Sequence, residues 1–259
     1  MAATRFKPFP HPAKAFAYTG DALKKRWREL HAGDCEPYPK QAAVQEAWRL
    51  FHQGRFGEAV AAGLEAEGAG VTAANKAQAI YANGVETREP ERLKHFEEAM
   101  QRAEAQAKRE PRNPNAHYLF AYAAGRYSQR ISVAKALAQG FGGRIRAALD
   151  ETLRLQPKHA EAHIAMGTFH AEIIDKVGAL VGGVTYGARR EAAEAHFRRA
   201  IELVPEAPIA YVEMARGLVL LHGRRALDQA RELQAKAASL APRDAMERLD
   251  VEAARALLA

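Results

Sequence analysis

The sequence predicts an all-α protein built as a solenoid of antiparallel helix pairs. Every segment of the chain shows either the 3.6-residue periodicity of an amphipathic helix or the composition of a loop. Alanine is abundant and runs of β-branched residues are scarce, which favours helices over strands. A third observation, a residue pattern that recurs along the chain, predicts how the helices pair. We expect about eleven or twelve helices and no sheet.

The recurring pattern places small, large and small residues along one helix and then ends that helix with a proline. Small residues let two helices approach closely, the large residue fills the gap between them, and proline cannot continue the helix. The clearest copy consists of Ala193, Phe197, Ala200 and Pro205. The same spacing occurs twice more, at Ile145, Leu149, Thr152 and Pro157, and at Ala230, Gln234, Ala237 and Pro242.

This pattern resembles the second helix of a tetratricopeptide repeat (TPR). A matching first helix follows each preceding proline, and the three copies align at His117, His163 and Tyr211. The resemblance covers roughly residues 41–242 and implies a right-handed superhelical solenoid of about four degenerate repeats. We expect residues 1–40 to form an N-terminal arm with a short basic amphipathic helix. Residues 41–259 are expected to form the solenoid, including a C-terminal capping helix.

Two of the units are longer than the period of about 34 residues that is usual for this family. The extra length falls between the first and second helix of each unit, in residues 131–143 and 173–187. Both inserts are apolar and end in glycines. They either lengthen their helices and pack back on the stack, or form an apolar pocket or a subunit interface. We expect them to be ordered and buried, because they contain Val133, Leu137, Ile173, Leu180 and Val184.

A narrower resemblance concerns residues 113–222. Their long repeats, apolar glycine-rich inserts and Tyr186-Gly187-Ala188 junction are similar to those of the TPR proteins associated with TRAP-type solute transporters. Proteins of that kind assemble as oligomers and engage a solute-binding protein. The resemblance implies an alternative function for this chain, a small-ligand-binding or transport-accessory role in which the inserts form a pocket or an oligomer interface.

The first helix of each unit supplies the concave side of such a solenoid, at positions offset from the packing residues. Tyrosine and arginine are the side chains that most often anchor interfaces. We therefore expect a non-enzymatic scaffold that binds a protein or peptide segment of unknown identity in a helical groove, with a homo-oligomer as a further possibility. The predicted partner-binding residues are Tyr118, Tyr122, Arg126, Ile164, Thr168, Glu172, Val212 and Arg216.

The sequence predicts neither catalytic residues nor a cofactor. It contains no HExxH, phosphate-loop or GxSxG motif. The candidate metal ligands are His159, His163 and His170, because histidines four apart on a helix can share a zinc ion. Two of them, His163 and His170, occupy packing positions of the repeat, so we expect no metal site. A metal-dependent enzyme would require these histidines to converge with a carboxylate.

Bulk properties narrow the range of functions further. The formal net charge is +7, but the basic clusters are interleaved with acidic residues, so we do not expect binding to nucleic acid. No apolar run reaches the roughly 18 residues of a membrane span. The N-terminus lacks the apolar core of a secretory signal, and Cys35 is the single cysteine. These features predict a cytoplasmic protein without an intramolecular disulfide.

Overall fold

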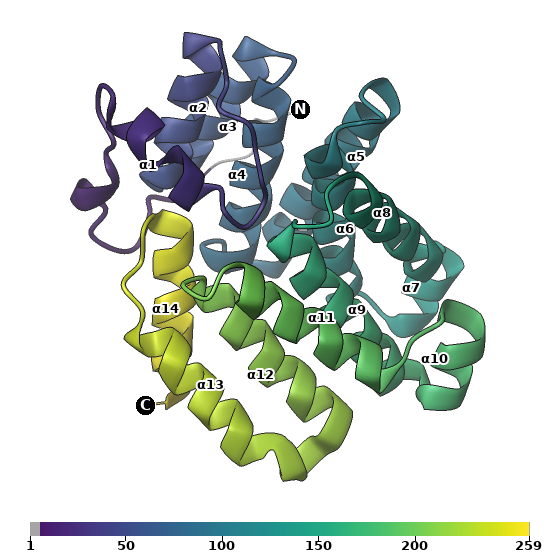
Figure 1. Ribbon diagram of the computed structural model, residues 1–259. Coiled ribbons are helices and arrows are strands. Elements are labelled where there is room, and N and C mark those ends of the chain that lie inside the picture. Colours follow the sequence, from purple (N-terminus) through teal and green to yellow (C-terminus); the bar gives the residue numbers. More distant parts are fainter. Residues whose placement is uncertain (1–5, 259) are drawn as a thin grey trace. The chain divides into compact units, whose positions relative to one another are not determined.

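The computed structural model describes residues 6–258, and every regular element within that range is helical. The all-α prediction is therefore confirmed for the described residues. The chain divides into two compact units (Figure 1). Unit 1 comprises Met1–His31, Glu36–Ser132 and Arg243–Met246, and unit 2 comprises Ala32–Cys35, Val133–Pro242 and Glu247–Ala259. The division into an arm (residues 1–40) and a solenoid (41–259) stays a prediction.

In unit 1, each helix from α2 to α5 packs against the next one. Helix α4 contacts α2, α3, α5 and α6, which makes it the centre of the unit. Its small residues Ala73, Ala74 and Ala77 are fully buried and allow this close packing. The helices are η1 (Lys14–Phe16), α1 (Ala22–Leu30), α2 (Ala42–His52), α3 (Phe56–Ala66), α4 (Gly70–Gly84), α5 (Glu89–Arg109) and α6 (Pro114–Ser128).

The N-terminal arm lies on unit 1 itself. The ring of Phe6 contacts Tyr81, with 4.6 Å between the ring centroids, and Phe9 contacts Phe56 at 6.0 Å. The backbone N–H of Lys7 donates to the Tyr81 hydroxyl at 2.9 Å. The large apolar side chains of Phe6 and Phe9 thus find partners within the same unit.

Unit 2 contains the three clearest copies of the repeat pattern. Its α9 packs against α8, α11 and α12, and α12 packs against α13. The helices are α7 (Val133–Ala138), α8 (Phe141–Leu155), α9 (Ala160–Val177), α10 (Ala179–Tyr186), α11 (Arg190–Leu203), α12 (Pro208–His222), η2 (Gly223–Ala226), α13 (Leu227–Ser239) and α14 (Ala245–Leu258).

The predicted register of the repeat is confirmed. Ala193, Phe197 and Ala200 of α11 are all fully buried. The Phe197 ring lies against Gly167 of α9 and Gly217 of α12, two positions where a Cβ atom would collide with it. The phenyl ring thus fills the space between three helices, and glycine provides that space.

The two inserts lie where they were expected, between the first and second helices, but the prediction that they are buried is wrong. Each forms a short helix of its own, α7 and α10, so the structure has more helices than expected. Leu180 and Val184 of α10 are 82% and 83% exposed, and Val133 and Leu137 of α7 are also exposed. Helix α10 packs on α9, where Gly182 lies against Ile173, but Leu180 and Val184 face solvent.

Candidate functional site

The predicted partner-binding residues of unit 1 form one group on α6. Tyr118 and Tyr122 lie one turn apart, with 6.0 Å between their ring centroids. The guanidinium of Arg126 lies over the Tyr122 ring, 5.3 Å from its centroid. Tyr118 is buried, whereas Tyr122 and Arg126 are half-buried. A cation–π contact of this kind restricts both side chains and leaves part of each open to a partner.

The predicted residues of unit 2 form a charged network between α9 and α12. Arg216 pairs with Glu172 across the two helices, and its Nη1 lies 3.8 Å from Glu213 Oε2. Thr168 Oγ1 donates to the same Glu213 oxygen at 3.1 Å, and Lys176 Nζ lies 3.2 Å from Glu172 Oε2. Both carboxylates are buried, but the Arg216 side chain is 41% exposed. The network therefore holds a partly exposed guanidinium in a defined position.

Two of the predicted residues have mainly a packing role. Ile164 is buried in a cluster with Ala200 and Ala210. Val212 is half-buried and packs against the cluster around Tyr211 and Ala237. These side chains connect the first helices to the rest of the unit, and they offer less surface to a partner than Arg216 does.

Sequence reasoning missed two members of the network, Glu213 and Lys176. A signal for Glu213 was present, because it is an acidic residue in the otherwise apolar helix of residues 208–222 and lies three positions before Arg216. Lys176 lies four positions after Glu172 on one helix, the spacing of an i,i+4 ion pair. Neither signal shows that the packing of α9 on α12 brings the Glu172–Lys176 pair and the Glu213–Arg216 pair together.

The histidines do not form a metal site in the part of the chain that the structure describes. His159 precedes α9 and caps it, since its Nδ1 accepts a hydrogen bond from the Ala162 N–H at 3.0 Å. His163 instead meets His196 of α11, a residue that sequence reasoning missed, with 2.8 Å between their Nδ1 atoms. His170 stacks on His196, with ring centroids 5.9 Å apart. The convergence with a carboxylate that a metal-dependent enzyme would need is not found among residues 6–258.

The contact between the two Nδ1 atoms requires that at least one of His163 and His196 is neutral. His163 Nε2 lies 3.1 Å from the Pro157 carbonyl oxygen and must donate to it, so a neutral His163 accepts at Nδ1. His196 then donates its Nδ1–H to that nitrogen. Burial is the main cause that lowers the pKa of His170 to about 4, and the positive charge of Arg146 contributes to the same shift. Burial, together with His163 and Arg146, likewise lowers the pKa of His196 to about 4.

The buried histidines make stability depend on pH. A histidine of the unfolded chain takes up a proton as the pH falls through its usual pKa of 6.5, but native His170 stays neutral down to about pH 4. Stability is therefore complete above pH 6.5 and is lost between 6.5 and 4, by up to about 3 kcal/mol for this one group. We expect His170→Leu, the residue type of Leu218 one unit later, to reduce this loss. Urea melts at about pH 7.5, 5.5 and 4.5 measure the free energy of unfolding of both proteins. The same decrease in this free energy with falling pH in variant and wild type would contradict the prediction.

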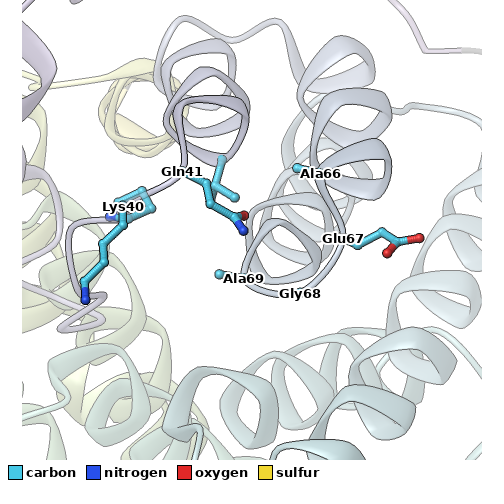
Figure 2. A pocket seen from close by; sticks show the side chains of 8 residues that line it. Lys40, Gln41, Ala66, Glu67, Gly68 and Ala69 are labelled. Carbon is cyan, nitrogen blue, oxygen red and sulfur yellow. The ribbon is translucent and has the colours of Figure 1, made fainter.

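A pocket of about 440 Å³ lies in unit 1, and its lining includes none of the residues predicted to bind a partner. Figure 2 shows it between the start of α2 and the turn that joins α3 to α4. Its charged residues, Lys40 and Glu67, lie on opposite sides, and the rest of the lining includes Pro39, Val44 and several small residues. Ligand sites usually combine an apolar wall with polar groups that converge. This pocket has no such convergence, so we assign it no ligand.

Within the described residues, none of the helices has both the length and the hydropathy that crossing a bilayer requires. The inserts do not form an enclosed cavity either, since the apolar side chains of α7 and α10 face solvent. The structure therefore presents two kinds of feature that could recognise another molecule: the partly exposed residues on first helices, and the exposed apolar inserts.

Helix pairs that stack through a small-large-small register define the class of protein: this is a TPR solenoid. The solved structure of TTC0263, a thermophilic TPR protein in Thermus thermophilus, is similar to it with a TM-score of 0.59 and 19% sequence identity. That match covers 85% of this chain and 100% of the other, and it shows the shared fold.

The particular family follows from a match over most of the sequence. Residues 72–259 match the family model RMD1-3, described as regulator of microtubule dynamics protein 1-3. The chain belongs to this family. No curated protein matched the chain. The narrower resemblance of residues 113–222 to TPR proteins of TRAP-type transporters stays a prediction.

Proposed function

We propose that this protein is a non-enzymatic interaction scaffold that binds a protein or peptide segment through the first helices of its repeats. The TPR fold supports the proposal, because stacked helix pairs present extended binding surfaces. The partner-binding residues that we propose are those predicted on α6, α9 and α12. The residues on α6 belong to unit 1 and those on α9 and α12 belong to unit 2, so each set is proposed as a contact of its own.

One observation carries the proposal: the arrangement around Arg216. Its guanidinium forms ion pairs with two buried carboxylates, Glu172 and Glu213, while 41% of the Arg216 side chain stays exposed. A side chain that is already fixed loses little conformational entropy when a partner binds, so more of the contact energy appears as affinity. The planar guanidinium also has five N–H donors, which suit peptide carbonyl and carboxylate oxygens.

The surface of α6 supports the same function with different chemistry. Tyr122 offers an aromatic face that Arg126 orients, and both side chains are partly exposed. Tyrosine combines a large apolar area with few rotatable bonds and is enriched among residues that dominate binding energy. Unit 1 would thus contribute an aromatic contact, and unit 2 would contribute a charged one.

The family description suggests which partner to test first. Because the family is described as a regulator of microtubule dynamics, polymerised tubulin is the first candidate. The competing role, a small-ligand or transport-accessory protein, stays an alternative. The exposure of α7 and α10 favours its surface-interface form over its pocket form.

The proposal predicts where the affinity resides. Tyr122→Ala and Arg216→Ala should each weaken binding by about 2 kcal/mol or more, because a few aromatic and arginine residues dominate most interfaces. Cosedimentation with polymerised tubulin measures the affinity. If tubulin does not bind, an affinity pull-down from native extract with mass spectrometry identifies the partner that is then titrated.

The matched control is a charge reversal at Arg198 and Arg199, two exposed arginines on α11, a second helix. Exposed ion pairs contribute little, so this reversal should change the affinity by less than about 0.5 kcal/mol. The reverse result, with binding lost in the control and kept in Tyr122→Ala and Arg216→Ala, would overturn the proposal. It would show that a polyanionic partner binds the basic exterior.

A further inference from the structure

Helices α7 and α10 of unit 2 carry apolar side chains that are exposed to solvent and not packed in the core. On α10, Leu180 is 82% exposed, Val181 is 52% and Val184 is 83%. On α7, Val133 is 42% exposed and Leu137 is 47%. Isolated exposed leucines are common, but several on two short helices form a patch of the kind that contacts another molecule.

The two helices belong to the same end of unit 2. Helix α7 leads directly into α8 through Gly140, whose φ of +64° allows a sharp turn. Helix α10 also contacts α8. The ring of Tyr186 lies against Gly142 in the first turn of α8, where a Cβ atom would be 2.5 Å from Cε1. In addition, Arg146 Nη1 donates to the Tyr186 carbonyl at 3.4 Å. Both helices therefore contact α8.

The charged residues in the two stretches of sequence that include α7 and α10 are all basic. The sequence contains no acidic residue from 133 to 149 or from 176 to 190, although Asp175 and Glu191 border the second stretch. The basic residues of the two stretches are Lys135, Arg144, Arg146, Lys176, Arg189 and Arg190.

Some of these cations have a partner within unit 2, and others do not. Arg146 pairs with Asp150 at 2.8 Å, and Lys176 pairs with Glu172 at 3.2 Å. Arg189 and Arg190 are exposed, and neither forms an ion pair within residues 6–258. Two more exposed arginines, Arg224 and Arg225, emerge nearby, because Ala188 and Ala226 share one buried cluster.

This charge pattern distinguishes between the possible occupants. A second copy of the chain on a two-fold axis would bring the same cations of both copies together around the apolar contact, and like charges there are costly. An anionic bilayer offers the complementary combination, phosphates for the cations and acyl chains for the leucine and valines. Helix α10 (Ala179–Tyr186) is too short to span a bilayer, so only a peripheral contact is open to it.

We infer that α7 and α10 form a peripheral docking surface for an anionic lipid bilayer. Leu180, Val181 and Val184 enter the boundary between headgroups and acyl chains, and Val133 and Leu137 widen the contact. Arg189 and Arg190 bind lipid phosphates at the rim. The surface is separate from the partner-binding residues that we propose on α6, α9 and α12, so either function can fail without the other.

Vesicle flotation tests the inference on the full chain. Vesicles of phosphatidylcholine with about a third phosphatidylglycerol should bind the wild type, and vesicles of phosphatidylcholine alone should bind it much more weakly. The double variant Leu180→Ser/Val184→Ser should lower binding to the anionic vesicles by about tenfold or more, because two exposed aliphatic side chains no longer enter the bilayer. Arg189→Glu/Arg190→Glu should have an effect of similar size, as each cation near an anionic surface contributes to binding.

Two double variants serve as controls, because they make the same kinds of substitution outside the proposed docking surface. Leu257→Ser/Leu258→Ser removes exposed apolar side chains from α14, and Arg198→Glu/Arg199→Glu reverses exposed charges on α11. Each should change vesicle binding by less than about twofold, because neither pair belongs to the patch. Helical circular dichroism and urea melts establish that all four variants remain folded.

Three results would overturn the inference. The first is a wild type that binds no anionic vesicles at low salt. The second is a wild-type dimer, seen by light scattering, that Leu180→Ser/Val184→Ser converts to a monomer, since the occupant would then be a second copy. The third is vesicle binding that depends on Arg189 and Arg190 but not on Leu180 and Val184, which would show that the contact is electrostatic only and that the apolar side chains do not enter the bilayer.

Discussion

Replacing Phe197 with alanine should lower the free energy of unfolding by about 3–5 kcal/mol, the usual cost of removing a buried aromatic ring. The Phe197 side chain is fully buried and touches glycines on two other helices. Since Gly167 and Gly217 have no side chains, these two positions cannot fill the cavity that the ring leaves. Urea denaturation followed by circular dichroism measures the loss. A loss below about 1 kcal/mol would show that the repeat register is wrong.

A matched pair of variants separates the ring's packing from a general loss of stability. Gly217→Ala alone should be destabilising, because its Cβ would collide with the Phe197 ring. In the Phe197→Ala background the same change should cost much less, since the ring is gone. The interaction energy from this double-mutant cycle should be about 1 kcal/mol or more. Additive effects would mean that Gly217→Ala destabilises the protein through a contact other than the one with the Phe197 ring.

The second large effect is expected at Asp244, whose carboxylate is buried in unit 1. Its Oδ2 lies 2.8 Å from Nδ1 of His52, and His52 is fully buried. The other nitrogen of that ring, Nε2, lies 3.2 Å from His31 Nε2, and His31 stacks on Trp27 with centroids 3.9 Å apart. A neutral His52 that donates to the carboxylate accepts from His31, so the three side chains form a single chain of hydrogen bonds.

Asp244→Ala should therefore destabilise the protein by about 3 kcal/mol, because it leaves the buried Nδ1–H of His52 without an acceptor. Asp244→Asn keeps an oxygen at the same position and should cost roughly half as much. Urea melts at pH 7.5 on both variants and the wild type give the comparison. If alanine proved no worse than asparagine, the hydrogen bond would not be what Asp244 contributes.

The repeat pattern could be predicted from sequence because it depends on local spacing. Phe197, Leu149 and Ala237 share a spacing that places one side of each helix in the core, and all three are fully buried. The spacing of packing residues follows from 3.6 residues per turn, so no knowledge of distant segments is needed. For the same reason the position of both inserts, between first and second helices, was correct.

The candidate sites were predicted less completely. Thr168, Glu172 and Arg216 were selected as offset positions, and they do lie together in one network. Their connection through Glu213 requires the packing of α9 on α12, which no local pattern specifies. His196 was missed for the same reason, since its contact with His163 joins residues on two different helices.

The sequence by itself determined the helical class, the repeat register and the residues that fill the gaps between helices. Periodicity and proline placement act within one or two turns, so they can be recognised from one segment alone. Only the tertiary structure decided that Leu180 and Val184 are exposed, that the histidines form a neutral cluster, and that Asp244 reaches His52. Burial and ion pairing depend on which segments meet, and segments far apart in sequence meet only once the whole unit has folded.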